Sequence, residues 1–138
     1  MASELRVNTL RGVSTAGSIS VVAEGNTNTT NLQQGLAKVW YNVNTTGTLV
    51  DSLNVSSHDD DGTGDGGIHI SSDMANTSYN LICATDDGGS GTHICVCNLT
   101  DGTLATGTFD YGVSYASASA TRTMADLVRF GEVHGDLA

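Results

Sequence analysis

The sequence contains no proline, one Trp, two Phe and four Tyr, and only 14% of its 138 residues are charged. Apolar residues make up 38% of the chain, which is below the average of globular proteins. Seventeen glycines and many Thr, Ser, Asn and Asp residues occupy much of the remainder. Because these residues form turns or tolerate strands better than helices, the composition favours many short strands.

Basic residues are the scarcest charged class, with five Lys and Arg against fifteen Asp and Glu, and the net charge is −10. Residues 1–40 sum to +1, from three basic and two acidic residues, and residues 41–138 sum to −11, from two basic and thirteen acidic residues. An acidic body of this kind repels nucleic-acid phosphates and anionic lipids. We therefore expect no nucleic-acid partner and no membrane partner, and the simplest role of the charge is solubility.

Long hydrophobic runs are missing as well. Residues 1–6 contain nothing like a signal peptide, and no stretch approaches the length of a membrane span. We therefore expect synthesis in the cytoplasm and three reduced thiols at Cys83, Cys95 and Cys97. A disulfide from Cys83 to Cys95 or Cys97 stays open if the protein works outside the cell.

Zinc is the other alternative for the cysteines, because His93, Cys95 and Cys97 recur at every second residue and share one face of a strand, with Cys83 as a fourth ligand. Structural zinc sites place more residues between neighbouring ligands, and buried cysteine behaves as a small hydrophobic residue. The sequence therefore predicts no metal here and no cofactor elsewhere.

From Leu36 onward, short apolar or alternating runs are separated by clusters of turn residues. The runs cover residues 37–43, 48–55, 67–70, 79–83, 92–99, 109–115 and 127–134. The turn clusters cover residues 59–67, 86–91 and 100–102. This rhythm predicts an all-β fold, an antiparallel β-sandwich of the jelly-roll-like kind. No clear helix is expected anywhere, and the best candidate for one is a short turn near residues 123–127.

Residues 1–35 differ from the rest, because they hold one β-like run, residues 18–22, followed by the polar tract of residues 25–31. Such a segment buries too little surface to fold alone, so it is a disordered tail or an arm that orders against a partner. We favour an extended N-terminal arm, residues 1–35, attached to a sandwich domain, residues 36–138. The candidate attachment residues are its apolar side chains Leu5, Val7, Leu10, Ile19 and Val21.

Trp40 is the only tryptophan of the chain. If Val39, Tyr41 and their alternating neighbours face the core, Trp40 lies on the opposite face of its strand, beside Lys38 and Asn42. Large aromatic residues on an outer face are typical of subunit interfaces. Trp40, Lys38 and Asn42 are therefore candidate interface residues, and the alternative is that this face is covered within the subunit.

An acidic loop is expected around Asp59, Asp61 and Asp65, whose alternating oxygens resemble the start of a calcium loop. The position where a bidentate Glu would close such a loop is Ile70, so the segment is not an EF-hand. The three aspartates are weak calcium candidates, and the alternative is a hairpin in which Asp and Gly serve turn geometry.

Catalytic motifs are not found, since the sequence has neither a Gly-x-Ser-x-Gly elbow nor a convincing phosphate-binding loop. A sandwich of this size offers little depth for a cleft with paired carboxylates. We therefore expect a protein that is not an enzyme.

Several stretches in a fixed order resemble tail-fibre-like proteins of marine bacteriophages. The similar stretches are LRVNTL (5–10), AKVWYNVNTTGT (37–48), DSLNVSS (51–57), DGTGD (61–65), IHI (68–70), MANTSY (74–79) and FGEVHGDLA (130–138). The resemblance covers residues 36–80 with few gaps and again the C-terminal end.

This resemblance implies a structural protein of the virion, a tail fibre or fibre-like appendage that is anchored by its N-terminal arm. It also implies a trimer that contacts other virion proteins and presents its C-terminal domain outward, toward host-surface glycan. A capsid decoration or cement protein, which stabilises the phage head, is the alternative. A secreted carbohydrate-binding module is a third reading, which the missing signal peptide disfavours.

Overall fold

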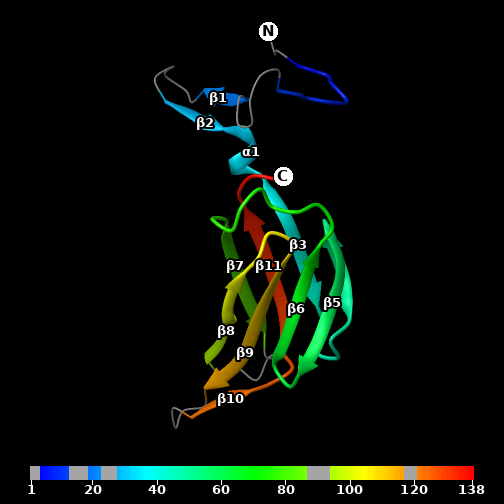
Figure 1. Ribbon diagram of the computed structural model, residues 1–138, viewed down its shortest axis with the longest axis vertical. Coiled ribbons are helices and arrows are strands. Elements are labelled where there is room, and N and C mark those ends of the chain that lie inside the picture. Colours follow the sequence, from blue (N-terminus) through cyan, green and yellow to red (C-terminus); the bar gives the residue numbers. More distant parts are fainter. Residues whose placement is uncertain (1–3, 13–18, 23–27, 87–93, 117–120) are drawn as a thin grey trace.

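The computed structural model of the chain describes residues 4–12, 19–22, 28–86, 94–116 and 121–138. Within these residues, two antiparallel sheets pack face to face, and a smaller hairpin lies beyond one end of them (Figure 1). The prediction of an all-β antiparallel sandwich is confirmed. None of the helices in the described ranges is long and apolar enough to cross a membrane.

The first sheet has the strand order β4-β3-β11-β7. Its strands are β3 (Ala37–Val43), β4 (Leu49–Leu53), β7 (Asn80–Asp86) and β11 (Val128–His134). The last strand of the chain therefore pairs with the first strand of the sandwich, and the register sets Glu132 opposite Trp40. This pairing ties the two ends of the sandwich domain together, because β3 is its first strand and β11 its last.

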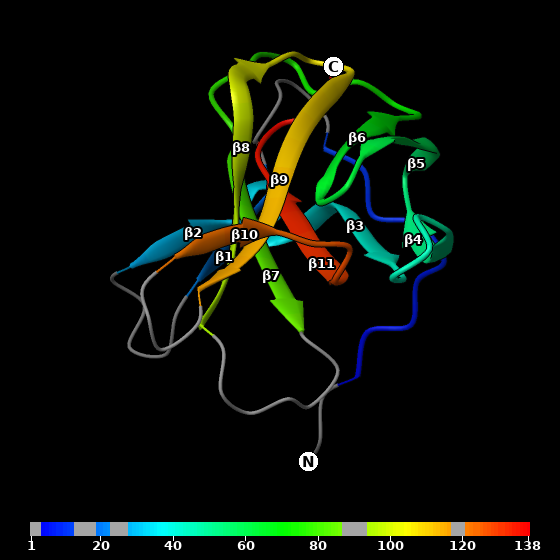
Figure 2. The same cartoon turned by 90° about the horizontal axis from the view of Figure 1, so that it is seen from below.

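The second sheet joins β5, β6, β9 and β8 in that order, and β10 also pairs with β9. Its strands are β5 (Val55–Gly62), β6 (Asp65–Ile70), β8 (Ile94–Leu104), β9 (Thr108–Ala116) and β10 (Arg122–Met124). Figure 2 looks along the long axis and shows β8, β9, β6 and β5 on one side, with β7, β11, β3 and β4 on the other.

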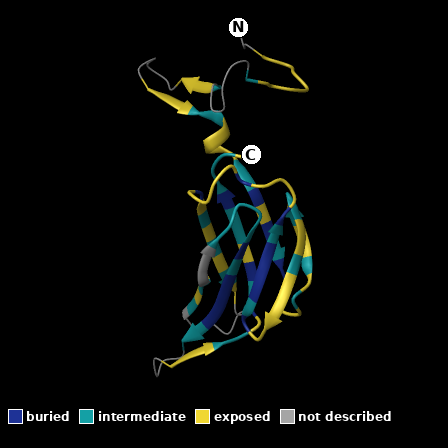
Figure 3. Ribbon diagram, in the orientation of Figure 1, coloured by how far each residue is buried: buried dark blue, intermediate teal, exposed yellow. Residues whose placement is uncertain are grey.

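The core lies between the two sheets (Figure 3). Its fully or nearly fully buried apolar residues are Val39, Tyr41, Val43, Ile68, Ile70, Met74, Tyr79, Phe109, Tyr111, Val113, Leu127 and Val133. Alternate residues of β3 and β9 supply half of them, as the period of two in the sequence predicts. The rings of Tyr41 and Tyr111 stack across the two sheets with centroids 6.0 Å apart.

Three expectations about local structure were wrong. The turn cluster expected at residues 100–102 lies within strand β8. Residues 59–62 belong to strand β5, and the turn that joins β5 to β6 is confined to Thr63 and Gly64. Gly64 has a φ of +71°, and a Cβ there would lie 2.4 Å from the carbonyl oxygen of Val113, so glycine is required. Residues 122–124 form strand β10 and not a helix, because they pair with Ser114–Ala116 of β9.

The arm leaves the sandwich beside the C-terminus and extends along the long axis (Figure 1). It contains β1 (Ser20–Val22), which pairs with β2 (Thr29–Asn31), and the single turn of α1 (Leu32–Gly35). Asn31 caps α1 by accepting a hydrogen bond from the backbone N–H of Gln34 at 3.1 Å. The expected division of the chain after residue 35 falls between α1 and β3.

Candidate interaction surfaces

The outer face of the first sheet carries a cluster of exposed apolar side chains. We call it the Trp40 face, and it consists of Trp40, Leu53, Ile82, Ala84, Phe130 and Glu132. Four strands supply it, because Trp40 lies opposite Leu53 on one side and Glu132 on the other, and Ile82 follows beyond Glu132. A shallow hollow of about 250 Å³ opens between Trp40, Ile82, Ala84, Phe130 and Glu132 and is also lined by Tyr41 and Gly131.

Each large apolar side chain of the Trp40 face keeps a third to a half of its surface in solvent: Trp40 36%, Phe130 39%, Leu53 47% and Ile82 50%. No described residue of the same chain covers them to the level of the core. Trp40 therefore lies where alternation predicts, on the face opposite the buried Val39 and Tyr41. Apolar clusters of this kind are typical of contact surfaces.

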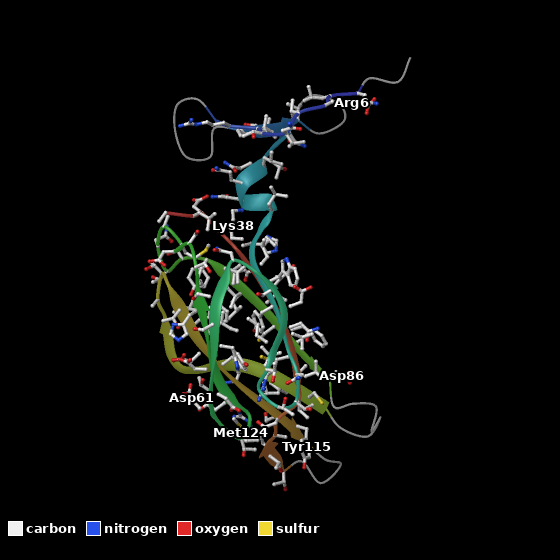
Figure 4. All side chains as sticks on the ribbon, turned by 90° about the vertical axis from the view of Figure 1, so that its right-hand side faces the viewer. Arg6, Lys38, Asp61, Asp86, Tyr115 and Met124 are labelled. Carbon is white, nitrogen blue, oxygen red and sulfur yellow. The ribbon has the colours of Figure 1, made fainter. Side chains whose placement is uncertain are left out.

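Lys38 lies at the junction of the arm and the sandwich (Figure 4). Its ammonium group donates hydrogen bonds to the carbonyl oxygens of Gln33 and of Leu36, the latter at 2.6 Å. Burial lowers the pKa of Lys38, and the nearby carboxylate of Asp136 opposes this shift. Lys38 therefore holds the last turn of α1 against the start of β3, and its charge is directed away from Trp40.

Asn42, the third candidate interface residue, lies in β3 between Asp51 of β4 and Phe130 of β11. It is half-buried. Asn42 thus belongs to the polar margin of the Trp40 face, at the end that lies away from Lys38.

The arm exposes apolar residues without a core of its own. Leu5 is 79% exposed, Val7 and Leu10 are 56% exposed, and Val21 is 50% exposed. Ile19 is only half-exposed, and its carbonyl oxygen accepts a hydrogen bond of 2.9 Å from the N–H of Leu32. Arg6 and Glu4 form an ion pair of 2.8 Å that is open to solvent. None of the described residues of the arm is buried.

The three aspartates that were weak calcium candidates lie on two neighbouring strands of the second sheet. Asp59 and Asp61 are exposed on β5, and Asp59 contacts the imidazole Nε2 of His69 at 2.6 Å. Asp65 lies on β6, where its carboxylate accepts from the hydroxyl of Thr100 at 3.1 Å. Within the described residues, no group of three or more His, Cys, Asp or Glu side chains is arranged to hold a metal ion. The expected loop is thus a pair of strands, because Asp59 and Asp61 lie on β5 and Asp65 lies on the inner strand β6.

Acidic side chains on β5 have a structural explanation. β5 is an edge strand, so its outer backbone groups could pair with a strand of another chain. A run of three aspartates, Asp59 to Asp61, hinders such pairing by charge. This edge is therefore poorly suited to association, in contrast with the Trp40 face.

A buried polar network was missed by sequence reasoning. The guanidinium of Arg129 is fully buried, donates to the carboxylate of Asp126 at 3.1 Å and lies 5.7 Å from the ring centroid of Tyr111. Asp126 also accepts from the N–H of Gly64 at 2.7 Å, so one carboxylate joins β11 to the turn between β5 and β6. The only signal in the sequence was that Arg129 occupies a position of its strand that alternates with outward-facing residues and so points toward the core. The network holds the fold together and suggests no chemical activity.

The cysteines lie on the inward faces of two neighbouring edge strands. Cys83 is on β7 opposite Gly131, and Cys97 is on β8 opposite Val113. A hydrogen bond joins the side chains of Cys83 and Cys97. Cys95 lies two residues away on β8 and packs against the core, and His93 of the zinc alternative lies outside the described residues.

Comparison with known proteins gave no match. No family model, no curated protein and no solved structure matches the chain.

Proposed function

We propose that this chain is a structural protein of a bacteriophage particle, a tail fibre or fibre-like appendage. The arm of residues 1–35 anchors it to a virion neighbour, and the acidic sandwich of residues 36–138 extends outward toward the host surface. The observation that carries the proposal is the exposure of Leu5, Val7, Leu10 and Val21 on an arm in which no described residue is buried. The resemblance of residues 36–80 and 130–138 to phage tail-fibre-like proteins supports it.

The free energy of folding explains why such an arm needs a partner. Ordering a backbone residue costs about 1–2 kcal/mol of conformational entropy, and only buried apolar surface offsets this cost. β1 and β2 pair over three residues each and leave Val21 and Val22 half exposed. A two-stranded hairpin without a covered face is marginal in water, so a virion neighbour that covers these side chains would stabilise it.

A second copy of the chain is the partner we propose for the Trp40 face. Of the thirteen acidic residues of the body, Glu132 lies within this face, and Asp51 and Asp86 lie at its margin. Burial of Trp40, Phe130, Ile82 and Leu53 against the same side chains of a second copy favours association through this face. The resemblance implies that the assembly is a trimer.

Gold-labelled antibody against this protein, viewed on intact particles by electron microscopy, tests the location. Gold at the tail supports the fibre proposal. Gold scattered over the head supports a capsid decoration protein, and loss of resistance to pressure or heat in particles without the protein would then be the next measurement. Absence of gold from every particle would contradict both virion roles.

Deletion of residues 1–35 tests the arm. The core residues all lie between Val39 and Val133, so the remaining sandwich is expected to fold but to be absent from purified particles. The control is the folded state of the deletion protein, measured by circular dichroism and thermal unfolding. Incorporation of the folded deletion protein into particles would contradict the anchoring role.

A further inference from the structure

Two thiols meet at one edge of the sandwich, where the two sheets come together. Some Cα atoms of β7 lie within 8 Å of Cα atoms of β8, although the strands belong to different sheets. Cys83 and Cys97 face each other across this edge and are joined by a side-chain hydrogen bond. Both are only partly buried, so small molecules in solvent can reach them.

We propose that Cys83 and Cys97 form a disulfide that joins the two sheets when the protein meets a low-molecular-weight disulfide such as oxidised glutathione. The inference does not rest on the proposed function, because any oxidising compartment supplies such a disulfide. The ring it closes runs from residue 83 to residue 97 and includes the connection between β7 and β8.

The geometry favours Cys97 over Cys95 as the partner of Cys83. Cys95 and Cys97 are two residues apart on β8, and β-strands rise about 3.3 Å per residue, so their Cα atoms are about 7 Å apart. A disulfide tolerates a Cα–Cα separation of at most about 7 Å. The hydrogen bond already selects Cys97, and a bond from Cys83 to Cys95 would require one strand to shift along the other.

The two thiols also differ in reactivity. The hydrogen bond from Cys97 lowers the pKa of Cys83 to about 7, although partial burial opposes the shift. The same hydrogen bond and burial raise the pKa of Cys97. Cys83 is thus the thiol that supplies the thiolate near neutral pH, and Cys97 keeps its proton until later in the reaction.

The reaction balances as two exchanges. The Cys83 thiolate attacks one sulfur of oxidised glutathione, an S–S bond forms to Cys83, and the other glutathione leaves as a thiolate. Cys97 then loses its proton and attacks the Cys83 sulfur, which releases the second glutathione. In total the protein thiols give up two electrons and two protons, and one oxidised glutathione becomes two reduced molecules.

Peptide mapping tests the bond directly. Residues 39–121 contain no Lys or Arg, so trypsin leaves all three cysteines in one peptide. Cleavage before aspartates instead gives residues 73–85 with Cys83 and residues 87–100 with Cys95 and Cys97. After incubation with oxidised glutathione, acid quench and alkylation, we expect these two peptides joined through Cys97, with Cys95 alkylated. A reduced sample serves as the control.

Serine variants sharpen the test. Cys95→Ser is the matched control and is expected to keep the cross-link, which raises Tm by roughly 5–10 °C over the reduced protein. Cys97→Ser is expected to accumulate glutathione on Cys83 and to show no such rise. Alkylation of all three cysteines after oxidation of the wild-type protein, or a bond from Cys83 to Cys95, would overturn the inference. The wild-type map decides the matter even if a serine variant does not fold.

Discussion

The imidazole Nε2 of His58 lies 2.6 Å from the hydroxyl oxygen of Tyr111, inside the sandwich. The other ring nitrogen, Nδ1, lies 2.9 Å from the carbonyl oxygen of Gly47, which can only accept. In the neutral ring Nδ1 therefore carries the proton, and Nε2 accepts the hydrogen bond from Tyr111. Protonation of His58 at Nε2 would remove this acceptor, and the hydroxyl of Tyr111 would lose the hydrogen bond that it donates.

Stability should therefore fall on acidification through His58. Burial lowers the pKa of His58 below its ordinary value of 6.5, and nearby Arg129 lowers it further, while the hydrogen bond to Gly47 and the carboxylates of Asp60 and Asp59 act in the opposite direction. The unfolded chain then binds a proton that the folded chain rejects, so stability is complete above pH 6.5 and is lost as the pH falls below it.

Urea unfolding at pH values above and below 6.5 measures this effect. The variant His58→Gln is expected to lose stability at neutral pH and to show a smaller dependence on pH than the wild type. His69→Gln is the control, because His69 is exposed beside Asp59 on the outer face. An unchanged pH dependence in His58→Gln would refute this assignment.

Asp126 is expected to matter more for stability than its exposure indicates. Its side chain is 42% exposed, but the guanidinium that it neutralises is 1% exposed. Asp126→Ala would leave the charge of Arg129 and the N–H of Gly64 without this acceptor, at an expected loss of about 2–4 kcal/mol. Asp126→Asn keeps an acceptor oxygen and should lose less. Denaturant titration of both variants measures the two losses of unfolding free energy. Equal losses would contradict the expectation that an acceptor oxygen alone preserves part of the stability.

Gly131 should not tolerate a side chain. A Cβ there would lie 2.3 Å from a ring carbon of Tyr41, which is held between the sheets by Phe109 and Tyr111. Gly131→Ala is therefore expected to cost about 2–3 kcal/mol of unfolding free energy. Gly35→Ala is the matched control, since nothing lies within 4 Å of its Cβ, and it should change stability by less than about 1 kcal/mol. Thermal unfolding compares the two, and similar Tm values would contradict the packing argument.

Trp40 should govern self-association if a second copy covers its face. Trp40→Glu adds charge and removes the aromatic ring, and it is expected to weaken association by at least about tenfold. Val96→Glu is the control, because Val96 is 45% exposed and lies opposite Ser114 on the other sheet. Sedimentation equilibrium over a range of concentrations measures both. An oligomer that survives Trp40→Glu unchanged would exclude this face as the contact.

Local patterning explains the parts of the fold that were predicted well. Val39, Tyr41 and Val43 are buried and Trp40 is exposed because neighbouring residues of a strand point to opposite faces, whatever the strand pairs with. The same rule fails for β5, since Ser57 to Asp61 are polar and resemble a loop, and only pairing with β6 makes them a strand. The short turn named near residue 123 as the best candidate for a helix is a strand for the same reason, because Arg122 to Met124 pair with β9.

The sequence by itself determined that the chain forms short strands with a core on one parity, an acidic body and an arm without a core. These properties depend on composition and on a period of two, which act over a few residues. The tertiary structure alone decided that Cys83 meets Cys97, that Arg129 is buried against Asp126, and that four strands gather Trp40 and Phe130 on one face. The physical reason is that strand order joins residues distant along the chain, and no local preference encodes that order.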